Sequence, residues 1–275
     1  MAVDTLASDI GFADAIEAAA FRDFFAGAPL ELARALRIRT VAIGGATALV
    51  AGVVRDPFLT RVIGLGVHAT ATETDLDRIA SVYREAGAAT HWIHLTPRPH
   101  PAELHAMLAR RGYIRPARKS WAKMVRDEAA LPAVATSLEV RRAKPEEHDA
   151  VGATVAAAFG MPAPFAAWFA SVAARPAWRT YAALDAGRIV GGGFLYLDDA
   201  GAWLGADGVQ PQFRGRHAQR ALMTLRVREA IAAGCTRIAT ETGEPLASEP
   251  NPSLANMVFC GFRKAASRLN YAAPI

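Results

Sequence analysis

The chain has 275 residues, of which 52% are hydrophobic, 21% charged and 8% aromatic, and its formal net charge is +5. This length and apolar content exclude a disordered chain and favour one large domain or two of ordinary size. The excess of basic residues is small and scattered along the sequence. We therefore expect a small anionic ligand, not nucleic acid, as a partner.

Cysteine usage and the N-terminal residues bear on the compartment. The two cysteines, Cys235 and Cys260, cannot form a disulfide framework and lack His partners at zinc-ligand spacing. Asp4 and Asp9 stand where a secretory signal would carry basic and then unbroken apolar residues. The longest uncharged run, 41–54, is shorter than the roughly 20 residues that a bilayer requires. We expect a cytoplasmic protein with no metal site and no membrane partner.

Hydrophobic periodicity and turn residues predict alternating helices and strands in the first half of the chain. In chain order they are a helix at 10–25, strands at 38–43, 47–54 and 61–67, a helix between Thr72 and Gly87, a strand at 91–95, a helix at 101–111 and a strand at 119–125. Thr72 and Asp75 have capping-box spacing, and Gly87 is a typical helix stop.

The second half repeats this order. Its predicted elements are strands at 138–142 and 202–209, a helix at 215–233, a strand at 237–241 and a helix at 253–260. Both halves place a Gly-aromatic pair after the later helix, at 112–113 and 261–262. We interpret this as a weak internal repeat of a β-α-β-α-β unit, although coincidence in an α/β protein gives the same order.

The stretch 127–137 is the best candidate for a linker, because short Ala, Pro and Thr segments separate two predicted strands there. The prediction is an α/β protein with a mixed sheet, divided into two related domains at 1–130 and 137–275.

The strongest motif spans 208–222, where a predicted strand ends, a turn containing glycine follows and a long helix begins. The first turn of a helix has free backbone N–H groups and the positive end of the helix dipole, so it attracts anions. Gly215 lets a phosphate approach the backbone, and Arg214, Arg216 and Arg220 add charged donors. The alternative is an ordinary basic helix start in a strand–helix crossover.

This stretch resembles the diphosphate-binding motif of the GNAT superfamily, whose members transfer acyl groups from acyl-coenzyme A (acyl-CoA) to amines. Val209, Pro211, Arg214 and Gly215 match the superfamily pattern in residue type. The resemblance extends over the second half of the chain, where the glycine-rich segment 190–194 is similar to the family's central strand, and covers the first half in outline. A Gly-rich hairpin is the alternative for 190–194.

Two positions depart from the superfamily pattern. The first glycine of the motif falls at His217, and the following Gly or Ala falls at Gln219. Both residues can still present backbone N–H groups to a diphosphate, provided that neither position needs a positive φ.

The resemblance implies that acetyl-CoA binds to the second domain, without a metal. The residues that it assigns to the cofactor are Val209, Arg214, Gly215, Arg216, His217, Ala218, Gln219, Arg220 and Asn256. Asn256 lies on the later helix, which flanks the pantetheine arm in the superfamily; a solvated residue near a helix start is the alternative. The first domain has no Arg or Lys at the corresponding turn, so we expect it to be degenerate and either structural or part of the acceptor cleft.

The turn of the first domain, 64–69, also fits a loose dinucleotide-binding pattern. The acidic residue that would bind a ribose is missing after the next predicted strand, 91–95. This disfavours a nicotinamide or flavin.

Acyl transfer to an amine requires a base and donors for the developing oxyanion. In the resembling family one strand splays from its neighbour, and a freed backbone N–H polarises the thioester carbonyl; here that strand is 202–209. Asp207 and Glu241 end the two central strands and are the candidate bases. Glu241 is preferred, because Asp207 precedes Gly208 as in a turn. Recognition of a cationic acceptor and a strand-end salt bridge are the alternatives for Glu241.

The general acid is not evident. The family's later helix often carries a Tyr that protonates the leaving thiolate, and Met257 stands at that position. Tyr271, on the last predicted strand, is a substitute candidate, with a core or rim role as the alternative. A thiol with a pKa of about 8.5 leaves without strong assistance, so loss of the acid need not abolish activity.

These observations predict an N-acetyltransferase that moves an acetyl or other acyl group from acetyl-CoA to a small-molecule amine by direct attack in a ternary complex. The alternative is a non-catalytic acyl-CoA sensor or scaffold. The acceptor, the acyl chain length and the choice between monomer and homodimer stay open. Loops at 159–178 and 244–250 are expected to shape the acceptor pocket, and the apolar candidates there are Phe165, Trp168, Phe169 and Trp178.

Overall fold

The computed structural model describes residues 2–52, 54, 56–97, 102–127, 130–246 and 250–274. The helices are α1 (Ala2–Ala26), α2 (Leu30–Leu36), α3 (Glu73–Glu85), α4 (Ala102–Arg110), α5 (His148–Ala158), α6 (Pro164–Ala173), α7 (Ala218–Ala232) and α8 (Pro252–Phe259). The strands are β1 (Ile38–Ile43), β2 (Ala46–Ala51), β3 (Arg61–Ile63), β4 (Trp92–Leu95), β5 (Ser120–Arg126), β6 (Glu139–Arg142), β7 (Trp178–Asp185), β8 (Arg188–Asp198), β9 (Gly201–Val209), β10 (Ile238–Gly243) and β11 (Arg263–Ala272). No helix within these described ranges is long and apolar enough to cross a membrane.

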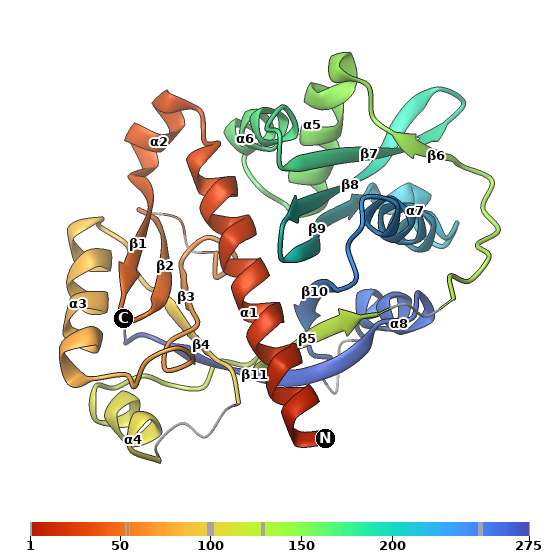
Figure 1. Cartoon of the computed structure of the whole chain (residues 1–275). Helices are drawn as coiled ribbons and strands as arrows, with labels where there is room; N and C mark the ends of the chain where they lie inside the picture. The colour runs from red at the N-terminus through yellow and green to blue at the C-terminus, as the bar shows by residue number, and fades with distance from the viewer. Residues whose placement is uncertain are drawn as a thin grey trace.

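The strands form one 11-stranded mixed sheet in the order β1-β2-β3-β4-β11-β5-β10-β9-β8-β7-β6. β11 lies between β4 and β5 and is antiparallel to both. β5, the last strand before the predicted linker, is antiparallel to β10. Each half of the chain therefore contributes its final strand to the junction, and the C-terminus lies beside the strands of the N-terminal half (Figure 1).

Three apolar cores cover this sheet. On one face, α1 packs with α5 and α6 over strands from both halves, and this core is continuous across the junction. On the other face, α3 and α4 cover the N-terminal strands, and α7 and α8 cover the C-terminal strands. Figure 1 shows α1 crossing between the two halves. The division into 1–130 and 137–275 stays a prediction, since one sheet and one core join the two parts.

Several predicted elements are confirmed. The capping box of α3 is present: the Asp75 backbone N–H donates to Thr72 Oγ1 over 3.1 Å, and the Thr72 backbone N–H donates to Asp75 Oδ2 over 2.9 Å. The described residues of the predicted linker contain neither helix nor strand. The glycine-rich segment 190–194 lies inside β8. Its glycines permit α5 to pack closely on the strand, since a Cβ at Gly192 would lie 2.6 Å from Val151 of α5.

Other predicted boundaries are wrong. The strand predicted at 61–67 ends at Ile63, because Gly64 and Gly66 have φ values of 81° and 76°. The helix predicted at 215–233 begins at Ala218, after two residues with positive φ.

The region 159–178, expected to be an acceptor loop, contains α6. The four aromatic residues proposed for the acceptor pocket, Phe165, Trp168, Phe169 and Trp178, are buried in the core shared by both halves. Three of them are on α6 and Trp178 is on β7, and all four belong to the hydrophobic core. Part of the other expected loop, 247–249, lies outside the described residues.

Candidate functional site

A cavity of about 540 Å³ lies where β9 ends. It is bounded by the first turn of α7, the start of α8 and the end of α5. Its lining residues are Ala158, Asp207, Gly208, Val209, Phe213, Arg214, Gly215, His217, Ala218, Gln219, Arg220, Asn251, Pro252, Ser253 and Asn256. Eight of the nine residues assigned to the cofactor from the sequence line it; Arg216 does not.

The backbone leading into α7 shapes one wall of this cavity. A short 3₁₀ helix, Pro211–Phe213, follows β9, and Gly215 has a φ of 79° with no atom within 4 Å of the place where a Cβ would be. The helix begins at Ala218, so the free N–H groups of its first turn and the positive end of its dipole lie at the cavity. This arrangement suits a phosphate or diphosphate group.

His217 has a left-handed backbone conformation. It therefore does not meet the condition, stated above for the diphosphate site, that this position avoids a positive φ. Its φ is 60° and its ψ is 17°, although it is not glycine. A side chain in this conformation costs about 1–2 kcal/mol. The turn therefore has at His217 a backbone conformation that favours glycine, at the expense of backbone strain. The His217 ring contacts the Ala135 carbonyl oxygen over 3.1 Å through Nδ1.

The charge of the cavity is positive. Arg214 is exposed and makes no ion pair with any residue the structure describes. Arg220 lies over the Phe259 ring at 4.2 Å and donates to Asn256, and no carboxylate among the described residues pairs with it. Arg216 points elsewhere and donates to Asp185 and Ser137 over 2.8 Å each, so its predicted role at the diphosphate is not supported by the geometry.

Hydrogen bonds join α7 to α8 along the cavity. Asn256 Oδ1 accepts from Arg220 Nε over 2.8 Å, and Asn256 Nδ2 donates to Gln219 Oε1 over 2.7 Å. Gln219 Nε2 in turn donates to Ser253 Oγ over 2.7 Å. Asn251 caps α8 by accepting from the Leu254 backbone N–H. Ser253 and Asn251 were not predicted as site residues; the Asn-Pro-Ser sequence at a helix start was the available signal.

The two central strands separate beside the cavity. β9 and β10 pair in parallel only at Ala202 with Ile238 and at Trp203 with Ala239. Beyond these positions β9 continues along β8 as far as Val209, and β10 continues along β5. The gap is bridged at its start by Thr240 Oγ1, which donates to the Leu204 carbonyl oxygen over 2.8 Å. The splay expected for strand 202–209 is present.

The preferred base, Glu241, lies in a buried ionic cluster. Its carboxylate accepts from Arg61 over 2.7 Å and from Arg268 over 2.5 Å, and its side chain is 3% exposed. Lys123 lies 3.4 Å away. Since three cations surround its carboxylate and Glu241 does not line the cavity, we do not assign the base to it. This environment corresponds to the salt-bridge alternative.

The same cluster contains Glu17 of α1. Burial alone would raise the pKa of Glu17, but the positive charges of Arg268, Lys123 and Arg61 outweigh burial and hold the pKa well below its ordinary value. The cluster therefore joins α1 to strands of both halves through ionised groups.

The other two catalytic candidates also have partners. Asp207 lines the cavity, but its two carboxylate oxygens face Arg226 at 2.5 and 2.6 Å. Tyr271 lies on β11 opposite Ile93 of β4, and its hydroxyl contacts His105 Nδ1 over 2.8 Å. Tyr271 does not line the cavity, so the structure does not bring it to the candidate site. Met257 lies on the buried face of α8.

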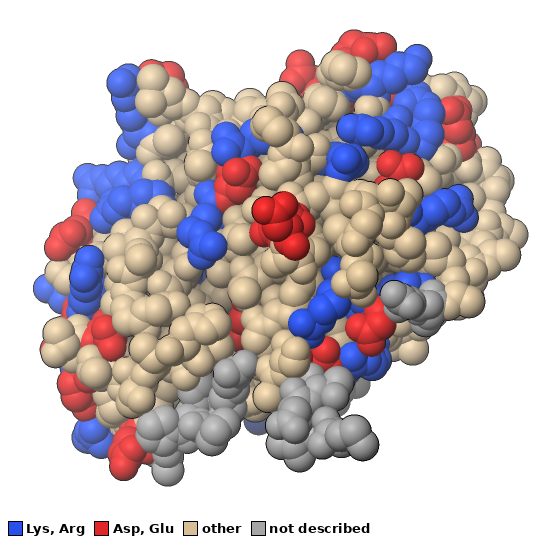
Figure 2. All heavy atoms as spheres, in the orientation of Figure 1, with Lys and Arg blue, Asp and Glu red and all other residues tan. Residues whose placement is uncertain are grey.

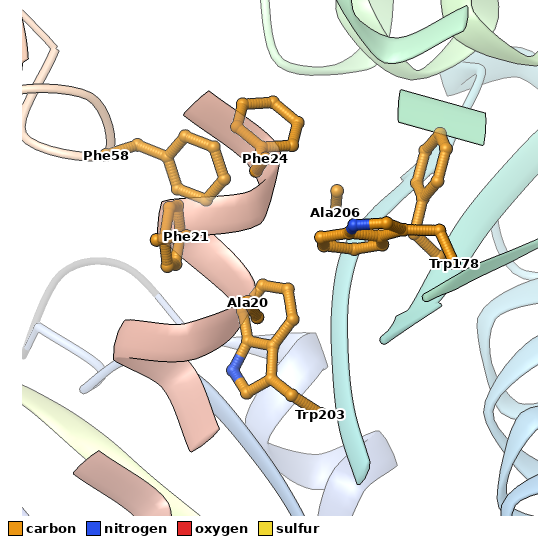
Figure 3. A pocket seen from close by; sticks show the side chains of 8 residues that line it. Ala20, Phe21, Phe24, Phe58, Trp178, Trp203 and Ala206 are labelled. Carbon is orange, nitrogen blue, oxygen red and sulfur yellow. The ribbon is translucent and has the colours of Figure 1, made fainter. Parts of the chain in front are cut away.

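A small void lies between α1 and β9. Its volume is about 10 Å³, and its lining is apolar throughout: Ala20, Phe21, Phe24, Phe58, Trp178, Phe194, Trp203 and Ala206. Figure 3 shows the aromatic rings from α1 and from the β7–β9 strands around the Ala206 side chain. Asp207, the next residue, lines the large cavity, but the void and the cavity have no lining residue in common.

Charged side chains of both signs are interspersed over the face that Figure 2 shows, and the basic residues there form no continuous stripe.

Residues 146–248 match the model of the acetyltransferase (GNAT) family. This segment is a GNAT acetyltransferase domain. The GNAT domain includes the splayed strands and the turn before α7, whereas α8 and Asn256 lie beyond the match. No curated protein matches the chain in a sequence search.

Solved structures share the fold over most of the chain. A GCN5-related N-acetyltransferase from Kribbella flavida has 14% identity and a TM-score of 0.61, covering 92% of this chain and 96% of that one. A second from Sphaerobacter thermophilus has 17% identity and a TM-score of 0.60, with 82% and 76% covered. A tandem GNAT protein from the clavulanic acid biosynthesis pathway has 15% identity and a TM-score of 0.56, with 78% and 74% covered. The chain thus has the mixed α/β fold of tandem GNAT-like domains, and the family model matches only the second.

Proposed function

We propose that the protein transfers an acetyl group from acetyl-CoA to the amine of a small molecule, with the donor bound in the cavity at α7. One observation carries the proposal: a cavity at a helix N-terminus, beside two splayed strands, in which Arg214 and Arg220 pair with no carboxylate of the described part of the chain. A diphosphate satisfies both the free backbone N–H groups and these guanidinium groups.

In the proposed reaction, a neutral amine attacks the thioester carbonyl carbon and a C–N bond forms while the C–S bond breaks. The new ammonium group loses a proton, and the departing thiolate gains one. The first turn of α7 and its arginines hold the diphosphate, and the polar groups of Ser253 and Asn256 lie along the path toward β9. The backbone of β9 at the splay binds the carbonyl oxygen.

A second candidate is an acyl-CoA sensor without turnover. It is favoured by Met257, which is buried where the family's Tyr would stand, and by the ion pair that occupies Asp207. Thiol release that depends on an added amine distinguishes the enzyme from the sensor.

Thermal unfolding with acetyl-CoA, and with NAD as the comparison ligand, tests the donor site. Ligand at about 100 times its Kd adds about 2.7 kcal/mol to the unfolding free energy, or roughly 5–10 °C for a protein of this size. Gly215→Leu removes the shift because its side chain enters the cavity. Gly234→Leu is the matched control: Gly234 also has a positive φ and open space around it, but it does not line the cavity. Equal shifts in both variants, or no shift in the native protein, would contradict the proposal.

A further inference from the structure

The edge of β9 beside the cavity contains a β-bulge. Gly208 pairs with Gly192 and Gly205 pairs with Phe194, so Ala206 and Asp207 together face the single residue Gly193. Ala206 has a φ of 53°, a conformation that disfavours any side chain. A bulge of this kind interrupts the strand ladder and leaves backbone groups without their regular partners.

One buried side chain contacts both strands around this bulge. Arg226 of α7 is 0% exposed. Its Nη1 donates to the Phe194 carbonyl oxygen over 2.9 Å and lies 3.4 Å from the Gly205 carbonyl oxygen. Its Nη2 donates to Asp207 Oδ2 over 2.6 Å, and Nη1 lies 2.5 Å from Oδ1. The guanidinium thus contacts the residue before Ala206, the residue after it and the strand opposite.

Gly193, the residue that faces the bulge, leaves room for the ion pair between Arg226 and Asp207. A Cβ at Gly193 would lie 2.9 Å from Arg226 Cζ and 3.0 Å from Asp207 Oδ1. Any side chain there would displace the guanidinium or the carboxylate. The glycine, the bulge and the ion pair therefore depend on one another.

General core packing does not require this arrangement. A buried arginine is expensive to desolvate, and a regular antiparallel ladder satisfies its own carbonyl groups without one. The bulge also coincides with the point where β9 has left β10 and where Asp207 and Gly208 line the cavity.

We propose that Arg226, through its ion pair with Asp207, is a positioning residue that holds the β9 bulge in the geometry that binds the thioester carbonyl. This inference rests on the proposed function. It gives Asp207 a structural partner and a role other than proton transfer.

The test compares the affinities of CoA and acetyl-CoA by isothermal titration calorimetry in Arg226→Met and Asp207→Asn. The two ligands share the diphosphate and the pantetheine arm and differ in the acyl group. We expect the native protein to prefer acetyl-CoA about 3- to 10-fold, the value of one hydrogen bond to the carbonyl. Both variants lose this preference. Arg226 does not line the cavity, so Arg226→Met changes the affinity for CoA by less than about 3-fold.

Val227→Ala is the matched control. Val227 is the next residue of α7 and is fully buried in the core, so its truncation destabilises the fold without altering contacts of Arg226 or Asp207. The preference for acetyl-CoA is retained in this control. Asp207→Asn keeps the shape of the side chain, so it serves if Arg226→Met does not fold.

Amide hydrogen exchange without ligand gives a second readout. Exchange over 203–209 becomes faster in both bulge variants than in the control. If the variants fold, keep native exchange over this segment and keep the preference for acetyl-CoA, the inference is wrong. If the native protein binds neither CoA nor acetyl-CoA, the proposed function fails and this inference falls with it; faster exchange would still establish the contact between Arg226 and the bulge.

Discussion

Replacement of Glu17 by Gln tests whether the buried ionic cluster stabilises the fold through its charge balance. Glu17 is 0% exposed; it accepts from Arg61 over 2.7 Å and from Arg268 over 2.5 Å, and it also contacts Lys123. The cluster balances its acidic members against its basic ones: Asp14, Glu17 and Glu241 against Arg61, Lys123 and Arg268. The amide preserves the shape of the side chain but leaves one positive charge uncompensated.

Removing one partner from a buried ion pair destabilises a protein by about 3–5 kcal/mol. Glu17→Gln is therefore expected to lower the unfolding free energy by about 3–5 kcal/mol and Tm by on the order of 10 °C. Glu241→Gln is expected to lose a similar amount, because its carboxylate faces the same cations. Urea unfolding followed by tryptophan fluorescence measures both losses.

Glu31→Gln is the control for a surface pair. Its side chain is 85% exposed and lies 3.1 Å from Arg34, so we expect a change below about 1 kcal/mol. A loss of less than about 1 kcal/mol in Glu17→Gln would refute the reasoning, since it would mean that water or rearrangement compensates the missing charge. If Glu241→Gln kept full stability and lost only turnover, Glu241 would be the base after all.

Two further predictions concern pH and the turn before α7. Burial lowers the pKa of His91 to about 4, so as the pH falls the unfolded chain is protonated at this residue before the folded protein is. The unfolding free energy is therefore expected to fall by about 3 kcal/mol from pH 6.5 to 4. The urea midpoint of His91→Gln falls less over this range than that of the native protein. A branched side chain at φ 60° is more strained than glycine, so the unfolding free energy of His217→Val is expected to be about 1–2 kcal/mol lower than that of His217→Gly. Equal urea midpoints for the two variants would argue against a left-handed turn.

The turn before α7 shows what local sequence determines. Residue order alone predicted most of the cavity lining, because free N–H groups, a glycine and arginines act within a few residues of one another, although the helix begins at Ala218 and not at Gly215. The left-handed backbone of His217 was not predictable from its residue type, since it follows from the path that the chain takes between β9 and α7.

The surroundings of Glu241 show what local sequence leaves open. Its partners come from β3, β5 and β11, and Arg61 precedes it by 180 residues. Pairing over such distances depends on the strand order of the whole sheet, which no local pattern encodes. The position of Tyr271 was misjudged for the same reason, because β11 lies beside β4 of the other half.

The position of β11 also has a consequence for how the chain acquires its structure. During synthesis, β4 emerges long before its neighbour β11, and its open edge has to wait for a strand that lies about 170 residues later. A long-lived open edge is a site for pairing with another chain. We expect the N-terminal half to remain incomplete until the C-terminal strand has docked, so that folding is a single late event for both halves and does not proceed one unit after the other.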